Sequence, residues 1–219
     1  MKLAGTLVLF AVAAATPAAL AQRWEIGGGA GGGFYTSQDV TLGSSGSAAA
    51  NLQTNLAGSA WLGNNGFGRW GGELRYDYQL GDFALKSGGT AATFGAHTQQ
   101  FHYDLLWYTN HAGSTVRPFV SAGAGIKLYQ GTGTEVVYQP LEQYALLTKA
   151  QDLTPLVSIG AGMKFQLGAH VQLKLEVHDY TTPFPKKVIT PNVGAKAGGW
   201  LHDFVPMAGI SYTTGFSER

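Results

Sequence analysis

Apolar and polar side chains alternate without a break from Trp70 to Leu80. One parity is mainly apolar or aromatic and carries Trp70, Leu74, Tyr76, Tyr78 and Leu80. The other parity is small or polar and carries Gly71, Glu73, Arg75, Asp77 and Gln79. A period of two is typical of a β-strand with two different faces. Eleven residues tilted by about 40° cover about 25 Å, the height of a membrane barrel's apolar band. This stretch therefore predicts a strand that crosses a membrane.

The same alternation recurs along the chain and predicts eight strands. Their predicted bounds are 24–35, 51–61, 70–80, 98–108, 117–129, 155–167, 171–180 and about 204–216. Long connections alternate with short ones, and the long ones are 36–47, 81–90, 130–152 and 181–199. In an antiparallel meander this places every long loop at one end, as in outer-membrane barrels. The sequence therefore predicts an all-β fold, an eight-stranded antiparallel up-and-down transmembrane β-barrel.

The composition agrees with a closed sheet in a membrane. Charged residues make up 12% of the chain, against about 25% in an ordinary soluble domain. Cysteine is absent, so disulfides contribute nothing to stability. The net charge of +1 gives no reason to expect a nucleic-acid partner.

The first residues have the pattern of a secretory signal peptide. Lys2 supplies a positive start, residues 3–15 are apolar, and Ala19-Leu20-Ala21 fits the cleavage rule for small residues. We expect a signal peptide over 1–21 and a barrel domain over 22–219, and therefore export from the cytoplasm.

Periodicity alone does not say which face of the barrel meets lipid, because a soluble barrel such as a lipocalin has the faces reversed. The polar parity is mostly Gly, Ser, Asn and Gln, with few charges for a solvated exterior. Large aromatics lie on the apolar parity at the short-turn ends of their strands, namely Trp24, Trp70, Trp107, Phe165 and Phe216. Such a girdle is expected where a lipid-facing wall meets the interface. We therefore predict that the apolar face meets lipid.

The opposite parity then points into the lumen and carries nearly balanced charges. Together with Glu25, these inward residues are Glu73, Arg75, Asp77, His102, Asp104, Lys127, Lys164, Lys174, Glu176 and His178. An eight-stranded barrel is just wide enough to be filled by side chains. We expect a network of paired charges, since a buried charge needs a partner. A gate of switching ion pairs that permits small conductance is the alternative.

Catalytic and cofactor motifs are weak. His102 and Asp104 share a face, but no nucleophile, base and orienting acid stand at a recognisable spacing. Residues 27–32 formally satisfy G-x-G-x-x-G, yet they lie in a predicted strand with no helix after them, so we expect the glycines to let strands approach closely. We predict no enzyme activity, no cofactor and no metal site.

Four segments resemble the small OmpA/OmpX-like outer-membrane β-barrel domain family over essentially all of the expected mature chain. They are 24–27, 70–76, 117–125 and 176–180, joined by the terminal strand 209–216. That strand is similar to the aromatic-ended signal read by the barrel-insertion machinery, although Ser217-Glu218-Arg219 follows the aromatic. The resemblance implies an outer-membrane location, contact with outer-membrane lipid and lipopolysaccharide, an unknown surface ligand and a monomer. It implies no wall anchoring, because the peptidoglycan-binding domain of OmpA has no counterpart here.

The long loops are the remaining candidates for contacts. Residues 130–152 are unusually apolar, so they extend the strands, fold over the barrel mouth or form a contact site. Lys186, Lys187 and Lys196 in 181–199 are candidates for lipopolysaccharide phosphates. The function we expect is a structural or cell-surface interaction role. The alternatives are a narrow, porin-like diffusion channel and a lipid A-modifying barrel enzyme.

Overall fold

The computed structural model describes residues 24–214 apart from positions 45 and 112. The predicted signal peptide and Phe216 of the predicted girdle lie outside these residues. Within this part of the chain no helix is long and apolar enough to cross a membrane.

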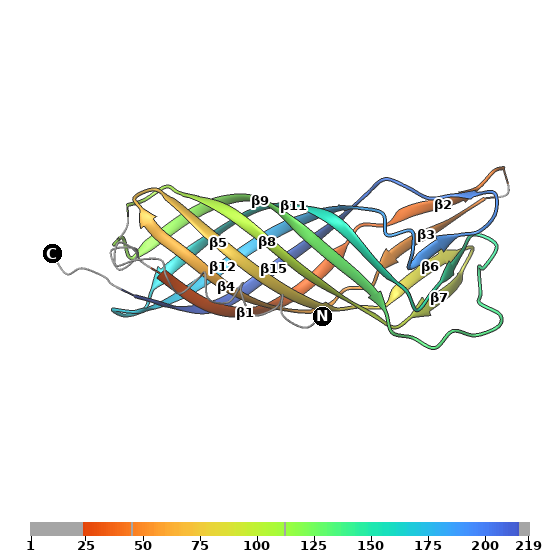
Figure 1. Cartoon of the computed structure of the whole chain (residues 1–219), viewed down its shortest axis with the longest axis horizontal. Coiled ribbons are helices and arrows are strands. Elements are labelled where there is room, and N and C mark those ends of the chain that lie inside the picture. Colours follow the sequence, from red (N-terminus) through yellow and green to blue (C-terminus); the bar gives the residue numbers. More distant parts are fainter. Residues whose placement is uncertain (1–23, 45, 112, 215–219) are drawn as a thin grey trace, which may run out of the picture.

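Eight long strands form one closed barrel (Figure 1). They are β1 (Trp24–Tyr35), β4 (Asn55–Phe67), β5 (Trp70–Leu80), β8 (Ala96–Tyr108), β9 (Val116–Gly131), β11 (Gln151–Gln166), β12 (Val171–Pro183) and β15 (Trp200–Thr213). Each strand pairs antiparallel with the barrel strands before and after it, and β1 closes against β15. The predicted eight-stranded up-and-down barrel is confirmed. The bounds of β1 and β5 are those that the sequence predicts.

The pairing register fixes the slope of the strands. Starting at Glu25, successive partners around the barrel are Gly63, Glu73, Asp104, Gly123, Ser158, Tyr180 and Asp203. Asp203 pairs with Tyr35, so one circuit returns to β1 ten residues above its start. A stagger of ten residues over eight strands corresponds to a tilt of about 40–45°.

The two faces of the wall differ as β5 predicts. Trp70 is the most exposed apolar residue of β5, at 55%, whereas Arg75 on the other face of this strand is 1% exposed. Outward side chains on the other strands are also large and apolar, including Ile26, Phe101, Val120, Ile159 and Ile210. The barrel is therefore polar inside and apolar outside, which excludes the lipocalin arrangement.

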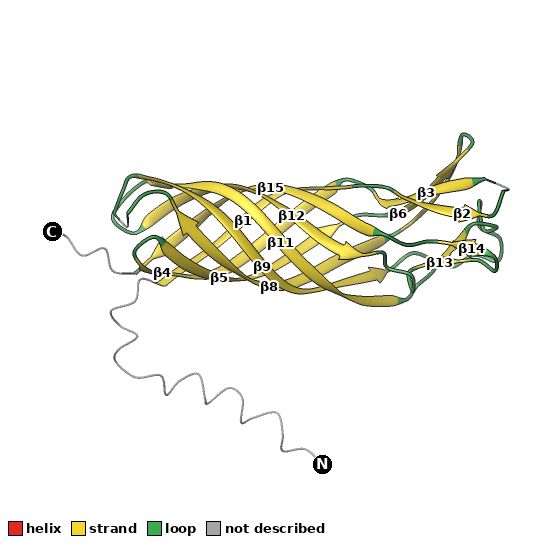
Figure 2. Cartoon of the chain, turned by 90° about the horizontal axis from the view of Figure 1, so that it is seen from above, coloured by secondary structure: helices red, strands yellow, loops and turns green. Residues whose placement is uncertain are grey.

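A second body of strands, here called the head, continues beyond one end of the barrel (Figures 1 and 2). Five of its strands form one sheet, in the order β14 (Ala195–Lys196), β2 (Gln38–Leu42), β3 (Ser47–Leu52), β6 (Phe83–Ser87) and β7 (Thr90–Phe94). The other two, β10 (Ala145–Leu147) and β13 (Ile189–Pro191), pair with each other. The prediction of loops at 36–47, 81–90 and 181–199 was wrong, because all three segments contain strands of the head.

The head has an apolar core of its own. Fully buried members come from several of its strands and include Val40, Ala50, Phe83, Leu85, Ala145 and Ile189. Leu52 belongs to this core, although the sequence analysis places it in the predicted barrel strand 51–61. The chain leaves β3 after Leu52, and β4 begins only at Asn55 and runs to Phe67.

The apolar segment 130–152 does two of the things expected of it. Its ends lengthen β9 to Gly131 and β11 from Gln151. Between them, Leu141, Tyr144 and Leu147 pack into the head core. The segment therefore both extends the strands and contributes to the structure above the mouth.

Candidate functional site

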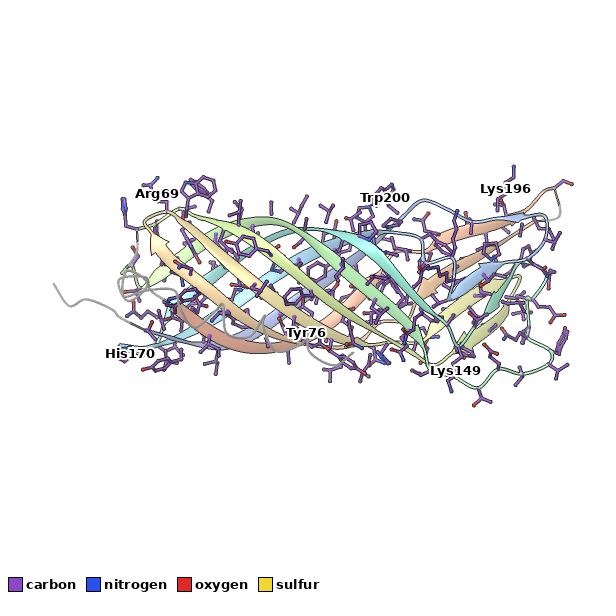
Figure 3. The ribbon with its side chains drawn as sticks, in the orientation of Figure 1. Arg69, Tyr76, Lys149, His170, Lys196 and Trp200 are labelled. Atoms are coloured by element: carbon purple, nitrogen blue, oxygen red, sulfur yellow. The ribbon has the colours of Figure 1, made fainter. Side chains whose placement is uncertain are left out.

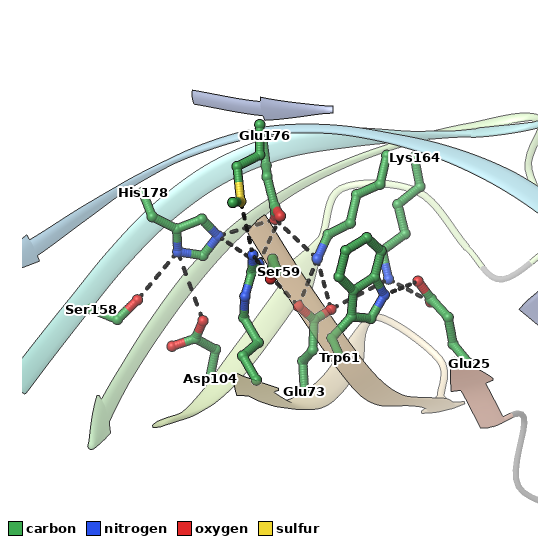
Figure 4. A network of polar contacts seen from close by, with 12 residues as sticks. Glu25, Ser59, Trp61, Glu73, Asp104, Ser158, Lys164, Glu176 and His178 are labelled. Carbon is green, nitrogen blue, oxygen red and sulfur yellow. Dashed lines mark hydrogen bonds and ion pairs between the residues drawn. The ribbon is translucent and has the colours of Figure 1, made fainter. Parts of the chain in front are cut away.

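The structure places all eleven predicted lumen residues, Glu25 among them, inside the barrel, and each is at most 7% exposed. All of them except Lys127 are linked through ion pairs of up to 4.0 Å in the middle of the lumen and in its lower part, the part remote from the head, and Figure 4 shows part of this network. Lys127 lies apart from them, nearer the head, where it pairs with Asp203.

Arg75 is the centre of the larger network. Its Nη1 lies 2.7 Å from Glu176 Oε1 and 3.2 Å from Glu73 Oε1. Its Nη2 donates to Ser59 Oγ at 2.9 Å and lies 3.4 Å from Asp77 Oδ1. The guanidinium fork thus reaches three carboxylates on two strands, a geometry that a lysine ammonium cannot reproduce.

Two lysines complete the lower half of the network (Figure 4). Lys174 Nζ lies 2.6 Å from Glu73 Oε1 and 2.9 Å from Glu176 Oε2. Lys164 Nζ lies 2.6 Å from Glu25 Oε2. Each ammonium group is therefore held against at least one carboxylate, as burial in a low-dielectric interior requires.

Histidines complete the upper half. His102 Nε2 lies 3.0 Å from Asp77 Oδ2, and His102 Nδ1 lies 3.2 Å from Asp104 Oδ1. A ring nitrogen must carry a proton to bond a carboxylate, so the two contacts together fit an imidazolium. The buried ion pairs contain six carboxylates and four Lys or Arg side chains. Among the described residues, acids in these buried pairs therefore outnumber Lys and Arg by two.

Apolar side chains fill the lumen around these charges. Towards the head, a buried cluster from β4, β11, β12 and β15 consists of Ala57, Leu156, Tyr180, Val205 and Met207. At the opposite end, Leu106, Tyr108 and Phe119 form a second cluster. The head core lies beyond the mouth. The described interior is therefore a polar core between apolar layers, and its charged side chains are almost inaccessible to water.

Trp61 is a lumen residue that the sequence interpretation missed. Its indole Nε1 donates to Glu25 Oε1 at 3.1 Å, and Lys174 Nζ lies 4.5 Å from the ring centroid. A Cβ at Gly27 or at Gly209 would collide with this ring. Parity was the available signal, since Trp61 follows Ser59 on the inward face. Gly27, in the glycine run of β1, thus lets the Trp61 ring lie close to the backbone of that strand.

Ser158, His178 and Glu176 have the contacts of a hydrolytic triad. Ser158 Oγ lies 3.2 Å from His178 Nδ1, and His178 Nε2 lies 3.0 Å from Glu176 Oε2. Such contacts activate a nucleophile where a substrate can approach. Here none of the three side chains is open to solvent, and His178 Nε2 also lies 3.2 Å from Arg75 Nη1. In the described lumen the three side chains are therefore joined to the buried network around Arg75.

The four predicted girdle residues within the described chain lie at the end of the barrel remote from the head. Trp24, Trp70 and Trp107 are exposed on the outer wall, and Trp70 pairs directly across from Trp107. Phe165 is half-buried in the same region. Phe34, Tyr78 and Phe204 are exposed on the same wall at the head end of their strands.

Metal ligation has no support in the described part of the chain, where no three His, Asp or Glu side chains are grouped to hold an ion.

No family model and no curated protein matches this sequence. Solved structures do match it. Neisserial surface protein A aligns with a TM-score of 0.53 and 11% identity, over 87% of this chain and 96% of that one. The outer membrane protein OprG from Pseudomonas aeruginosa aligns with a TM-score of 0.54 and 15% identity, over 89% of this chain and 97% of that one. The resemblance to small outer-membrane barrels is confirmed for the fold.

Proposed function

We propose that the chain is an integral outer-membrane barrel with a closed lumen, whose role is structural or lies in contacts made by its external head. The apolar outer wall and the two aromatic zones support membrane insertion with the short turns inside. The head then stands outside the membrane. The folds of Neisserial surface protein A and OprG, an outer membrane protein, agree with this location.

The filled lumen carries the argument against conduction. Lys127, Lys164 and Lys174 are each at most 2% exposed, so water has almost no access to the charges that would line a pore. Planar-bilayer recordings of the refolded protein should show no discrete openings. Openings that persist in wild type and disappear in Arg75→Leu would favour the channel alternative and overturn this part of the proposal.

The head is the surface that supports a contact role. It is held by its own apolar core, yet large apolar side chains remain at its surface, with Tyr138 71% exposed. Exposed patches of this kind are typical of interaction sites. Cell binding by the full-length protein should fall when the adjacent Val136-Val137-Tyr138 is replaced by Ser-Ser-Ser, while heat-modifiable gel mobility stays unchanged. Equal binding by both proteins would place the contact elsewhere.

The proposal includes no enzyme activity. The triad-like group in the lumen is sealed, and this favours a structural role for its members. Mass spectrometry of lipid A from cells with and without the protein should give the same profile. A modified species present only in expressing cells would contradict this.

Export and insertion are part of the same proposal. We expect the signal peptide to be removed after Ala21, and the last strand to be read by the barrel-insertion machinery. N-terminal sequencing of the protein recovered from outer membranes should begin at Gln22. Recovery of a chain that begins at Met1 would show that the segment is retained.

A further inference from the structure

A groove of about 200 Å³ runs along the outer wall just below the head. Its outward side chains come from β5, β8, β9 and β11 and are Tyr76, Gln99, Phe101, Ile126, Leu128 and Leu153. Four of these six are purely hydrocarbon. The groove is lipid-facing under the proposed function, so its base suits an acyl chain.

One member of the groove is an amide on a wall that is otherwise apolar. Gln99 shares its parity with the exposed Phe101 and Tyr103. Its Oε1 accepts from the Tyr76 hydroxyl at 3.0 Å, and its Nε2 lies 3.5 Å from His97 Nε2. The long second contact leaves N–H capacity for an acyl carbonyl. A polar group facing lipid is costly unless it is hydrogen-bonded.

Lysines stand above the groove, on the head side. Leu153 lines the groove near the start of β11. The side chain of the adjacent Asp152 has the opposite parity and is buried, and it accepts from the Lys187 backbone N–H at 3.1 Å and lies 3.7 Å from Lys187 Nζ, so Lys187 lies at the start of β11. The carbonyl of Lys187 accepts from Thr148 Oγ1 at 2.8 Å, which brings Lys149 beside the turn that carries Lys186. In Figure 3, Lys149 and Tyr76 lie along the same edge of the molecule, with Lys149 nearer the head.

Acidic groups at this position only partly offset the lysines. Asp152 is buried and engaged by Lys187, and Glu135 Oε1 accepts from the Lys149 backbone N–H at 2.7 Å. Among the described residues, Lys149 and Lys186 have exposed side chains and form no ion pair within 4 Å. Three cations therefore face two carboxylates, and the excess is positive.

We propose that the groove and these lysines form a binding site for a phosphorylated, acylated glycolipid of the lipopolysaccharide class in the outer leaflet. An acyl chain occupies the groove, its ester or amide carbonyl accepts from Gln99, and a phosphate meets Lys149, Lys186 and Lys187. This order of apolar, polar and cationic groups matches the order of groups in such an amphiphile. The inference rests on the proposed outer-membrane location.

The test is the affinity of the refolded full chain in detergent for diphosphoryl lipid A, measured by native mass spectrometry. The variant Lys149→Gln with Lys186→Gln removes two lysines of the site, and Lys86→Gln with Lys196→Gln is the matched control. Lys86 and Lys196 are also exposed on the head, and Lys196 lies far from the groove in Figure 3. We expect the first pair to weaken binding roughly tenfold to thirtyfold, and the control to change it little. Equal effects of the two pairs would overturn the site.

A second variant tests the groove without changing charge. Ile126→Trp fills the groove, whereas Ile159→Trp adds the same ring to another outward position. Only Ile126→Trp should weaken lipid A binding. Wild type should bind lipid A without phosphates more weakly than diphosphoryl lipid A, and equal affinity for the two lipids would refute the phosphate contact.

A separate measurement distinguishes failure of this inference from failure of the proposed function. Protease protection in phosphatidylcholine vesicles and heat-dependent gel mobility report insertion without lipid A. An inserted barrel with no preference for lipid A would overturn the lipid site alone. A protein that does not insert would overturn both.

Discussion

Arg75 Nη1 and Glu176 Oε1 lie 2.7 Å apart inside the barrel, although the residues are separated by 101 positions in the sequence. The contact joins β5 to β12 across the lumen, so it depends on closure of the whole barrel rather than on any hairpin. Both side chains are buried, so the ion pair is shielded from solvent.

Replacing Arg75 by leucine should therefore be strongly destabilising. The change leaves Glu73, Asp77 and Glu176 without their shared partner, and breaking one side of a buried pair costs about 3–5 kcal/mol. Arg75→Lys keeps the charge and loses the fork, so its cost should be smaller but measurable. Urea titrations of the refolded protein in detergent, followed by gel mobility, measure both. An Arg75→Leu protein as stable as wild type would show that the network does not hold the barrel together.

Arginine at Leu74 should cost about 2–4 kcal/mol, because it places a charge on the lipid face near mid-membrane. Leu74 is 38% exposed on the outer wall. Leu80→Arg is the matched control at the head end of the same strand, and there the cost should fall to about 0–1 kcal/mol. Folding free energies in lipid vesicles compare the two. Equal costs at the two positions would contradict the proposed depth of β5.

Gln100 offers the opposite case. Its side chain is buried, yet neither amide atom has a hydrogen-bond partner among the described residues. Gln100→Leu should leave the free energy of unfolding unchanged or raise it, since removing an unsatisfied polar group relieves its desolvation cost. Gln79 donates to Asp203 at 2.9 Å and accepts from Tyr35 at 2.7 Å, so Gln79→Leu should destabilise by about 1–3 kcal/mol. A loss of stability in Gln100→Leu as large as that in Gln79→Leu would reveal a partner for Gln100.

Gly27→Ala should destabilise the barrel by about 1–3 kcal/mol through overpacking, because the new methyl would meet the indole of Trp61. Trp61→Leu on the same background should recover part of the loss, since the smaller side chain makes room. Unfolding free energies of the two single variants and the double variant give the coupling. Simple additivity would mean that the strands, rather than the ring, absorb the methyl.

Most of the barrel was predictable from the sequence because its signal repeats every two residues over long spans. The bounds 24–35 and 70–80 agree with β1 and β5, and the apolar parity faces outward as expected. The inward placement of charges such as Glu73 and Lys174 follows from the same parity. The pairing of individual acids with individual bases does not follow from parity, because it depends on the register of the strands around the closed sheet.

The head escaped prediction for a physical reason. Its strands are two to six residues long, and several lie in segments rich in Gly, Ser and Thr. The alternation of Val40 and Leu42 with Asp39 and Thr41 is therefore too short to stand out. What stabilises them is tertiary packing into a common core, which no local pattern reports. Asp203 was missed because the predicted last strand began one residue after it, whereas β15 begins at Trp200.

The place of Trp61 between Gly27 and Gly209 bears on how the barrel reaches its correct register. These two glycines lie on β1 and β15, the strands that join the two ends of the chain. If β15 slipped by two residues, Met207 or Ser211 would take the place of Gly209 beside the Trp61 indole. The Trp61 ring of β4 therefore disfavours a shifted pairing of β1 with β15, because the shifted side chain would collide with it.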